Sequence, residues 1–272
     1  MTMQLHLQQV PPRNGRLWIR HGFKVFQRQP LALAGLFGLF LFAGFAAMLI
    51  PLIGPVLLIA FLPLLSLGFM LATHLVLQKK TPTAAVFIAP LKLTPERRRQ
   101  QLILCGSYAL LALLISAVSD WVDGGALREF VSRMASADAN SVADSLADPR
   151  LLWGVVLRMS LVLLLAVPYW HAPALVHWGG QGAAQALFSS ALALWRNRAA
   201  FFVNGLLWAL LTIASGLLPA MLLEAVGLAA AGPLVGMVIS LILSTVFYAS
   251  LYFSFVDCFM FGAPANLLDN QS

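Results

Sequence analysis

The sequence predicts an all-α membrane protein, a polytopic bundle of six transmembrane helices, and two observations carry that prediction. Hydrophobic residues make up 60% of the 272-residue chain and charged residues only 10%, whereas soluble proteins carry roughly 25% charge. Residues 31–77 contain no Lys, Arg, Asp or Glu. Because a bilayer helix needs about 20 apolar residues, this stretch is long enough for two spans joined by a turn.

The spans follow from the apolar segments and from the turn and capping residues between them. A leader of residues 1–30 comes first. Gly54 and Pro55 belong to the first turn, Pro63 should kink the second span, and Asp148 is the expected N-cap of the fourth. The predicted spans are 31–50, 56–77, 102–119, 151–176, 199–222 and 234–255.

The distribution of Lys and Arg predicts the orientation. The leader carries five, residues 78–101 six and residues 178–198 two, whereas the opposite connections carry three, all in the acidic loop 120–150. Cytoplasmic loops are enriched in Lys and Arg. We therefore expect one integral domain in a bacterial inner membrane, with both termini cytoplasmic and the loop 120–150 periplasmic. The net charge of +7 is then a topological signal, and no nucleic-acid partner is expected.

The leader contains a short amphipathic stretch, from Gly15 to Gln29. Its cations recur every four residues and form one stripe, whose members are Arg16, Arg20, Lys24 and Arg28. Aromatic and aliphatic residues cover the rest, so the helix could lie among lipid headgroups, with its cations on anionic lipid and its aromatics toward the acyl chains. A purely topogenic leader is the alternative, and both stay open. Residues 182–198 form a second such lead-in.

An internal repeat is suggested by an offset of 178 residues. Gly54-Pro55-Val56 matches Gly232-Pro233-Leu234, and Phe69 matches Phe247. The simplest arrangement is three tandem helical hairpins, each introduced by a cytoplasmic interfacial segment. An even number of spans separates the copies, so their pseudo-symmetry axis would lie along the membrane normal. Chance similarity between apolar segments is the alternative.

Small residues recur every fourth position along the last span, a spacing that lets helix backbones approach closely. The stripe consists of Gly232, Gly236, Ser240 and Ser244. We interpret it as a helix-packing surface whose partner lies in this chain, in a second copy or in another membrane protein.

Three polar residues inside spans are candidates for function. Arg158 is the charged residue deepest within a span and is costly there. It either anchors the structure by pairing with Asp120 or Asp123, or contacts a solute or a lipid headgroup. Asn204 is expected to be an interhelical hydrogen-bond donor. His74 lies near the inner end of its span.

The histidines and the paired acids favour no catalytic or metal chemistry. His74, His171 and His177 would lie near the same membrane surface, but their spacing fixes no ligand geometry, so no metal or cofactor is predicted. Asp120 and Asp123 are interpreted as part of a hydrated loop. The sequence contains no G-x-S-x-G, H-E-x-x-H, P-loop or dinucleotide motif, and we therefore expect no enzyme.

Several turn and interface motifs resemble those of a family of uncharacterised multi-pass inner-membrane proteins from β-proteobacteria. They are Trp18…Gly22-Phe23…Phe26…Arg28-Gln29-Pro30, Ile50-Pro51-Leu52-Ile53-Gly54-Pro55 and Pro63…Gly68-Phe69. The resemblance covers most of the chain and implies an inner-membrane location. It carries over no active-site residue and no substrate.

Two functions remain in view. The favoured one is a non-catalytic accessory, scaffold or lipid-interacting membrane protein, with membrane lipids as partners. The alternative is a transporter or exporter of a lipid or small solute, whose path would be lined by kinked spans and Arg158. An intramembrane enzyme ranks last, because no nucleophile with a base can be named.

Overall fold

The computed structural model describes residues 7–135 and 148–259, and within these ranges it contains helices and no strand. Six helical segments are long and apolar enough to cross a membrane, which confirms the all-α polytopic fold. They are α2 (Pro30–Met48), α3 (Ile53–Leu77), α5 (Pro95–Val122), α8 (Pro149–Tyr169) continued by α9 (Ala172–Gly179), α11 (Arg198–Ala225), and α12 (Gly232–Phe259).

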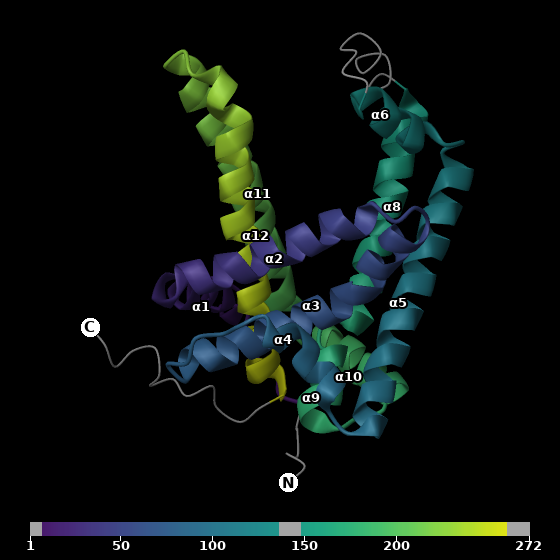
Figure 1. Cartoon of the computed structure of the whole chain (residues 1–272), viewed down its shortest axis with the longest axis vertical. Coiled ribbons are helices and arrows are strands. Elements are labelled where there is room, and N and C mark those ends of the chain that lie inside the picture. Colours follow the sequence, from purple (N-terminus) through teal and green to yellow (C-terminus); the bar gives the residue numbers. More distant parts are fainter. Residues whose placement is uncertain (1–6, 136–147, 260–272) are drawn as a thin grey trace.

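Shorter helices connect or precede these spans. They are α1 (Asn14–Arg28), α4 (Ala85–Ile88), η1 (Ala89–Lys92), α6 (Ala126–Ala135), α10 (Ala183–Arg196) and η2 (Ala229–Ala231). The spans themselves pair as three hairpins, α2–α3, α5–α8 and α11–α12. In Figure 1 the second and third hairpins rise and diverge toward the top, and α2 passes between them. We call the lower part, formed by α1, α4, α9, α10 and the span ends they contact, the base.

One pairing recurs around the base. Each lead-in helix packs against the second span of the hairpin before it: α4 against α3, and α10 against α8. The first lead-in has no preceding hairpin, and α1 packs instead against α12, the last span of the chain. The contacts therefore close into a ring of three units. The sequence repeat and its symmetry axis stay a prediction.

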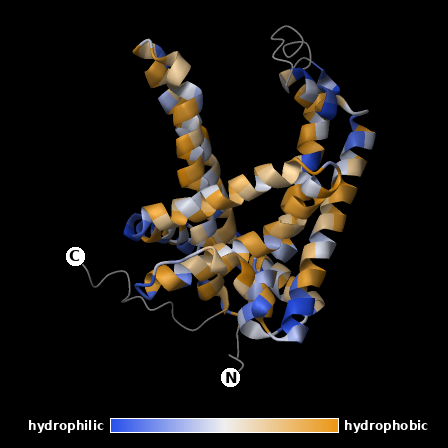
Figure 2. Ribbon diagram, in the orientation of Figure 1, coloured by the Kyte–Doolittle hydropathy of each residue, from blue (hydrophilic) through white to orange (hydrophobic). Residues whose placement is uncertain are grey.

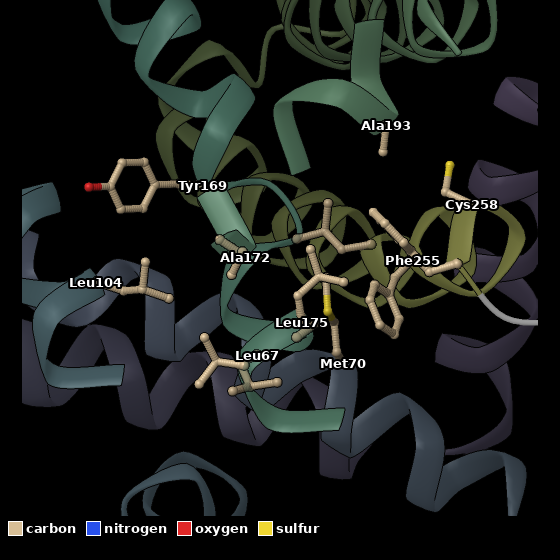
Figure 3. Close-up of a cluster of buried hydrophobic side chains, with 14 of the residues drawn as sticks. Leu67, Met70, Leu104, Tyr169, Ala172, Leu175, Ala193, Phe255 and Cys258 are labelled. Atoms are coloured by element: carbon tan, nitrogen blue, oxygen red, sulfur yellow. The ribbon is translucent and has the colours of Figure 1, made fainter. Parts of the chain in front are cut away.

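The buried core lies in the base, whereas the outer parts of the hairpins are exposed. Leu67, Leu104, Leu175 and Phe255 come from α3, α5, α9 and α12 and form one cluster (Figure 3). Farther out, apolar side chains face outward, and Leu52 is 86% exposed. Figure 2 shows these hairpins as mainly hydrophobic, with hydrophilic stretches near their ends. Such surfaces require hydrocarbon rather than water around them.

The fourth span, predicted over 151–176, is interrupted between Pro168 and Pro173. Ser190 of α10 accepts a hydrogen bond from the amide of His171 at 3.0 Å and donates one to the carbonyl of Val167 at 3.1 Å. In a regular helix that amide would bond directly to that carbonyl. The serine hydroxyl has entered the hydrogen-bond ladder, and helices bend where a side chain inserts in this way. The chain then restarts as α9.

Helix α1 is held on α12 by a carboxylate. One Oδ atom of Asp257 accepts hydrogen bonds from Trp18 Nε1 at 2.7 Å and from Asn14 Nδ2 at 2.8 Å. The Trp18 side chain is 1% exposed, and Ile19 and Val25 are buried beside it. The apolar face of this amphipathic helix therefore packs on protein. The expectation that its aromatic side chains face acyl chains was wrong for Trp18.

Two glycines let the α1 backbone come close enough for this contact. A Cβ at Gly15 would collide with the carbonyl oxygen of Ala200, and one at Gly22 would lie 2.9 Å from the carbonyl oxygen of Val246. Side chains larger than hydrogen at these positions would push α1 away from α11 and α12.

The segment before α1 is fixed to the same end of the bundle. Asn197, which is 2% exposed, accepts a hydrogen bond from the Val10 amide at 2.8 Å and donates one to the Gln8 carbonyl at 3.0 Å. The Gln8 amide bonds to the Cys258 carbonyl at 2.8 Å. Residues 7–13 and the end of α12 therefore lie on one side of the molecule.

Removing the Asp257 carboxylate should loosen α1. We expect Asp257→Ala to lower the free energy of unfolding by about 2 kcal/mol, because a buried indole N–H loses its charged acceptor. Thermal unfolding in detergent, followed by tryptophan fluorescence, would measure this. Glu224→Ala removes an exposed carboxylate instead and should leave the melting temperature unchanged. Equal melting temperatures for both variants would contradict the role assigned to Asp257.

Candidate functional site

The basic face of α1 is the strongest candidate for a binding surface. Arg16, Arg20 and Arg28 are exposed and Lys24 is half-buried, all on the side of the helix away from Trp18 and Val25. Lys24 and Arg28 also interact within the chain. The four residues of the predicted stripe therefore lie on one face of α1, and the opposite face is docked on α12. They are Arg16, Arg20, Lys24 and Arg28.

The loop after α3 extends this positive surface. Gln29 Nε2 donates a hydrogen bond to the carbonyl of Lys80 at 3.3 Å, so the end of α1 lies beside the exposed Lys79 and Lys80. The first acidic residue in the sequence is Glu96. The N-terminal lead-in and the loop after α3 thus present cations with no acid among residues 1–95, and the Asp257 carboxylate lies at the docked face of α1. The excess of cations favours an anionic ligand.

Arg158 is an anchor in this structure. Its guanidinium donates hydrogen bonds to Asp120 Oδ1 at 2.5 Å and to the Ser116 carbonyl at 3.3 Å. Arg128 also pairs with Asp120. The ion pair joins α5 to α8. Of the two alternatives that the sequence left open for Arg158, the structure has the one in which it pairs with Asp120.

Asp123 differs from the expected hydrated acid. It is 1% exposed, and its Oδ1 accepts a hydrogen bond from the Gly125 amide at 2.7 Å. Gly154 of α8 lies against the carboxylate, and a Cβ there would collide with it. The expectation that water reaches both Asp120 and Asp123 was therefore wrong for Asp123, because the absent side chain at Gly154 brings α8 over it.

The start of α8 agrees with the sequence. The Asp148 side chain accepts a hydrogen bond from the Arg150 amide at 2.9 Å, as an N-cap does. The Arg150 guanidinium also hydrogen-bonds to this carboxylate and holds the pKa of Asp148 below its usual range.

The three histidines are each engaged separately. His74 Nδ1 lies 3.0 Å from the Tyr252 hydroxyl, and its Nε2 lies 2.8 Å from Gln78 Nε2. His171 is fully buried, with Nε2 3.0 Å from Ser254 Oγ. His177 packs its ring edge-on against Trp178. Among residues 7–135 and 148–259, no three His, Cys, Asp or Glu side chains come together as metal ligands would.

Asn204 lies where α11 meets α1. Its side chain is 5% exposed, and Nδ2 donates a hydrogen bond to the Gly15 carbonyl at 3.5 Å. This is an interhelical bond of the kind expected from the sequence, although its partner is the lead-in helix rather than another span.

The small-residue stripe on α12 lines an open groove in this chain. A Cβ added at Gly232 or at Gly236 would meet nothing within 4 Å among the described residues. Gly236, Ser240 and Ser244 border a groove of about 570 Å³ between α11 and α12. The close helix contact expected of the stripe is therefore not made within the described chain at the two glycines, and a partner outside the chain stays a prediction.

Sequence reasoning did not identify Asp257 as a contact residue. Its partners Asn14 and Trp18 lie 243 and 239 positions away, so no local spacing could reveal the contact. The available signal was indirect: Trp18 lies on the apolar face of an amphipathic helix, where a buried indole N–H needs an acceptor.

These features define the class of the protein, which is a multi-pass α-helical membrane protein with exposed Lys and Arg side chains on its base. A comparison of sequences agrees. The chain is 30% identical over 270 residues to a probable inner membrane protein of Burkholderia thailandensis, covering 98% of this chain and 99% of the relative. The chain belongs to the family of that inner membrane protein. No family model and no solved structure matches it.

The Arg158–Asp120 pair gives a direct test of anchoring. Asp120→Ala should lower the free energy of unfolding by about 2 kcal/mol, because it leaves a partly buried guanidinium without its carboxylate. Arg158→Met should cost less, since an apolar side chain suits hydrocarbon. Adding Arg158→Met to Asp120→Ala should restore stability. A double variant that melts no higher than Asp120→Ala in detergent would contradict the anchoring role.

Proposed function

We propose that the protein is a non-catalytic accessory or scaffold protein of the bacterial inner membrane, and that the basic face of α1 binds anionic lipid headgroups. The family supports the membrane location. The single observation that carries the lipid proposal is the geometry of α1: its apolar face is docked on α12, and Arg16, Arg20 and Arg28 are exposed on the opposite side.

Docking changes what the cations can do. A free amphipathic helix must insert its apolar face into lipid to stay at the surface. In α1 this face is already buried on protein, so the cations are held in place before any lipid binds. A preorganised site loses less conformational entropy on binding. Each Lys or Arg near an anionic membrane surface contributes about 1 kcal/mol.

The orientation is part of the same proposal. Of the 17 Lys and Arg residues, four lie at the α5–α8 end: Arg128, Arg133, Arg150 and Arg158. The other thirteen (17 − 4) belong to the lead-ins, the loop after α3 and the first turn of α5. Because Lys and Arg are retained on the cytoplasmic side, we propose that the base and both termini face the cytoplasm. There α1 meets the anionic cytoplasmic leaflet.

The transport alternative depends on a polar path that reaches Arg158. Four grooves in the described part of the chain are lined by residues other than Arg158, and Arg158 is engaged by Asp120. This favours the accessory role. We also propose that the family of this inner membrane protein is a β-proteobacterial one.

Neutralising the α1 face should release anionic lipid. We expect replacement of all four stripe residues by Gln to lower the amount of phosphatidylglycerol that stays bound in mild detergent by roughly tenfold or more. The changes are Arg16→Gln, Arg20→Gln, Lys24→Gln and Arg28→Gln. Native mass spectrometry would count the bound lipids, with phosphatidylethanolamine as the neutral reference.

A charge-matched control separates a site from general attraction. Four other exposed cations of the base can be changed to Gln: Lys92, Arg98, Arg99 and Arg196. This variant should retain the bound lipid. If both variants lose phosphatidylglycerol equally, the α1 face is no specific lipid site.

The orientation can be tested with two introduced thiols, since Cys105 and Cys258 are buried. In intact cells, a membrane-impermeant maleimide should label Val131→Cys in α6, which is exposed, and spare Lys92→Cys. Both should react after lysis. Labelling of Lys92→Cys in intact cells would invert the proposed topology.

A further inference from the structure

A chamber lies where the three hairpins meet. It has a volume of about 220 Å³ and is lined by residues of α3, α5, α8 and α12 and by Trp170, which follows α8. Its walls are largely aromatic. The residues that matter for its chemistry are Ser66, Tyr108, Tyr169, Trp170, Phe247 and Tyr248.

Two hydroxyls in this chamber are left without a partner. The Tyr169 hydroxyl donates to Ser107 Oγ at 2.7 Å, and Ser66 Oγ donates to the Pro63 carbonyl at 2.8 Å. Within the described parts of the chain, the hydroxyls of Tyr108 and Tyr248 have no hydrogen-bond partner, and no charged side chain lines the chamber. An unpaired hydroxyl is costly at membrane depth. The chamber thus offers two donors, from α5 and α12, to an uncharged acceptor.

The chamber adjoins a second space. Phe247 and Tyr248 also border the groove of about 570 Å³ between α11 and α12. The groove is lined by small side chains, among them Gly216 and Gly236, and Ser240 on its border is exposed. The two spaces together match the usual size of a ligand site, about 300–1,000 Å³. One is aromatic with hydrogen-bond donors, and the other has a volume that can hold part of a hydrocarbon chain.

We infer that the chamber and groove bind an isoprenoid quinone. The flat ring would lie among the aromatic walls, with its carbonyl oxygens accepting hydrogen bonds from Tyr108 and Tyr248, and the tail would follow the groove. A phospholipid headgroup fits less well, because its phosphate would find no cation in the chamber. The inference concerns binding and is independent of the lipid contact at α1.

The ring contact is tested by removing the two hydroxyls. The protein in nanodiscs is titrated with decyl-ubiquinone, which would quench Trp170 in the chamber wall and Trp208 in the groove wall. Combined Tyr108→Phe and Tyr248→Phe should weaken binding about tenfold or more, since each net hydrogen bond contributes about 0.5–1.5 kcal/mol. Tyr252→Phe is the matched control, because Tyr252 does not line the chamber and its hydroxyl already has a partner in His74, and it should bind like the unaltered protein.

The tail contact is tested separately. Ser240→Phe should fill the groove and weaken decyl-ubiquinone at least tenfold, while the tailless benzoquinone ring binds as before; the exposed position keeps the variant folded. The inference is overturned if the double tyrosine variant, with an unchanged melting temperature, binds decyl-ubiquinone normally. It is also overturned if phosphatidylglycerol displaces decyl-ubiquinone at equal concentration, which would make ordinary lipid the occupant.

Discussion

The contact of α1 with α12 is the constraint on which the arrangement of the hairpins depends. The other lead-ins each pack on the hairpin just before them, so α4 and α10 connect neighbours in the sequence. The contact between the first and last elements closes the ring of lead-ins among the described helices, and α12 also packs directly on α2 and α3. The Asp257 carboxylate supplies the polar part of the contact between α1 and α12, and the missing side chains of Gly15 and Gly22 supply the close approach. A small loss at this point therefore affects the whole base.

The physics of the surroundings explains why contacts concentrate there. In hydrocarbon, apolar side chains gain nothing by leaving the solvent, so packing and interhelical hydrogen bonds must hold helices together. The base uses both: Asn197 and Asp257 tie the N-terminal segment to the last span, and Ser190 joins α10 to α8. The outer parts of the hairpins have few such bonds and diverge (Figure 1). Arg158 and Asp120 form the exception, where α5 and α8 are joined near their outer ends.

Much of the fold could be predicted from the sequence because it follows from local properties. Long apolar runs give the six spans, and a short polar side chain before a proline gives the Asp148 cap. The rest depends on distant partners. The break after Tyr169 lies between Pro168 and Pro173, which the sequence shows, but the hydroxyl that enters it comes from α10. The burial of Asp123 arises from the absent side chain of Gly154. Likewise the amphipathic pattern of α1 predicts an apolar face, but whether lipid or protein covers it depends on α12. Of the candidate site, the sequence showed the cationic stripe and did not show the chamber, since no spacing relates Tyr108 to Tyr248.

The polar groups of this protein thus fall into two sets with different consequences. In the base, Asn197, Asp257 and Ser190 have partners within the chain, and their bonds contribute to stability. At the meeting point of the hairpins, the hydroxyls of Tyr108 and Tyr248 have none among the described residues. Phenylalanine would fill the same space without the cost of an unpaired hydroxyl. Stability therefore gives no reason for tyrosine at these two positions, whereas an acceptor that enters from the membrane does. At α1 the case differs, because Lys24 and Arg28 also interact within the chain, and it is the exposure of Arg16, Arg20 and Arg28 that favours an anionic surface outside it.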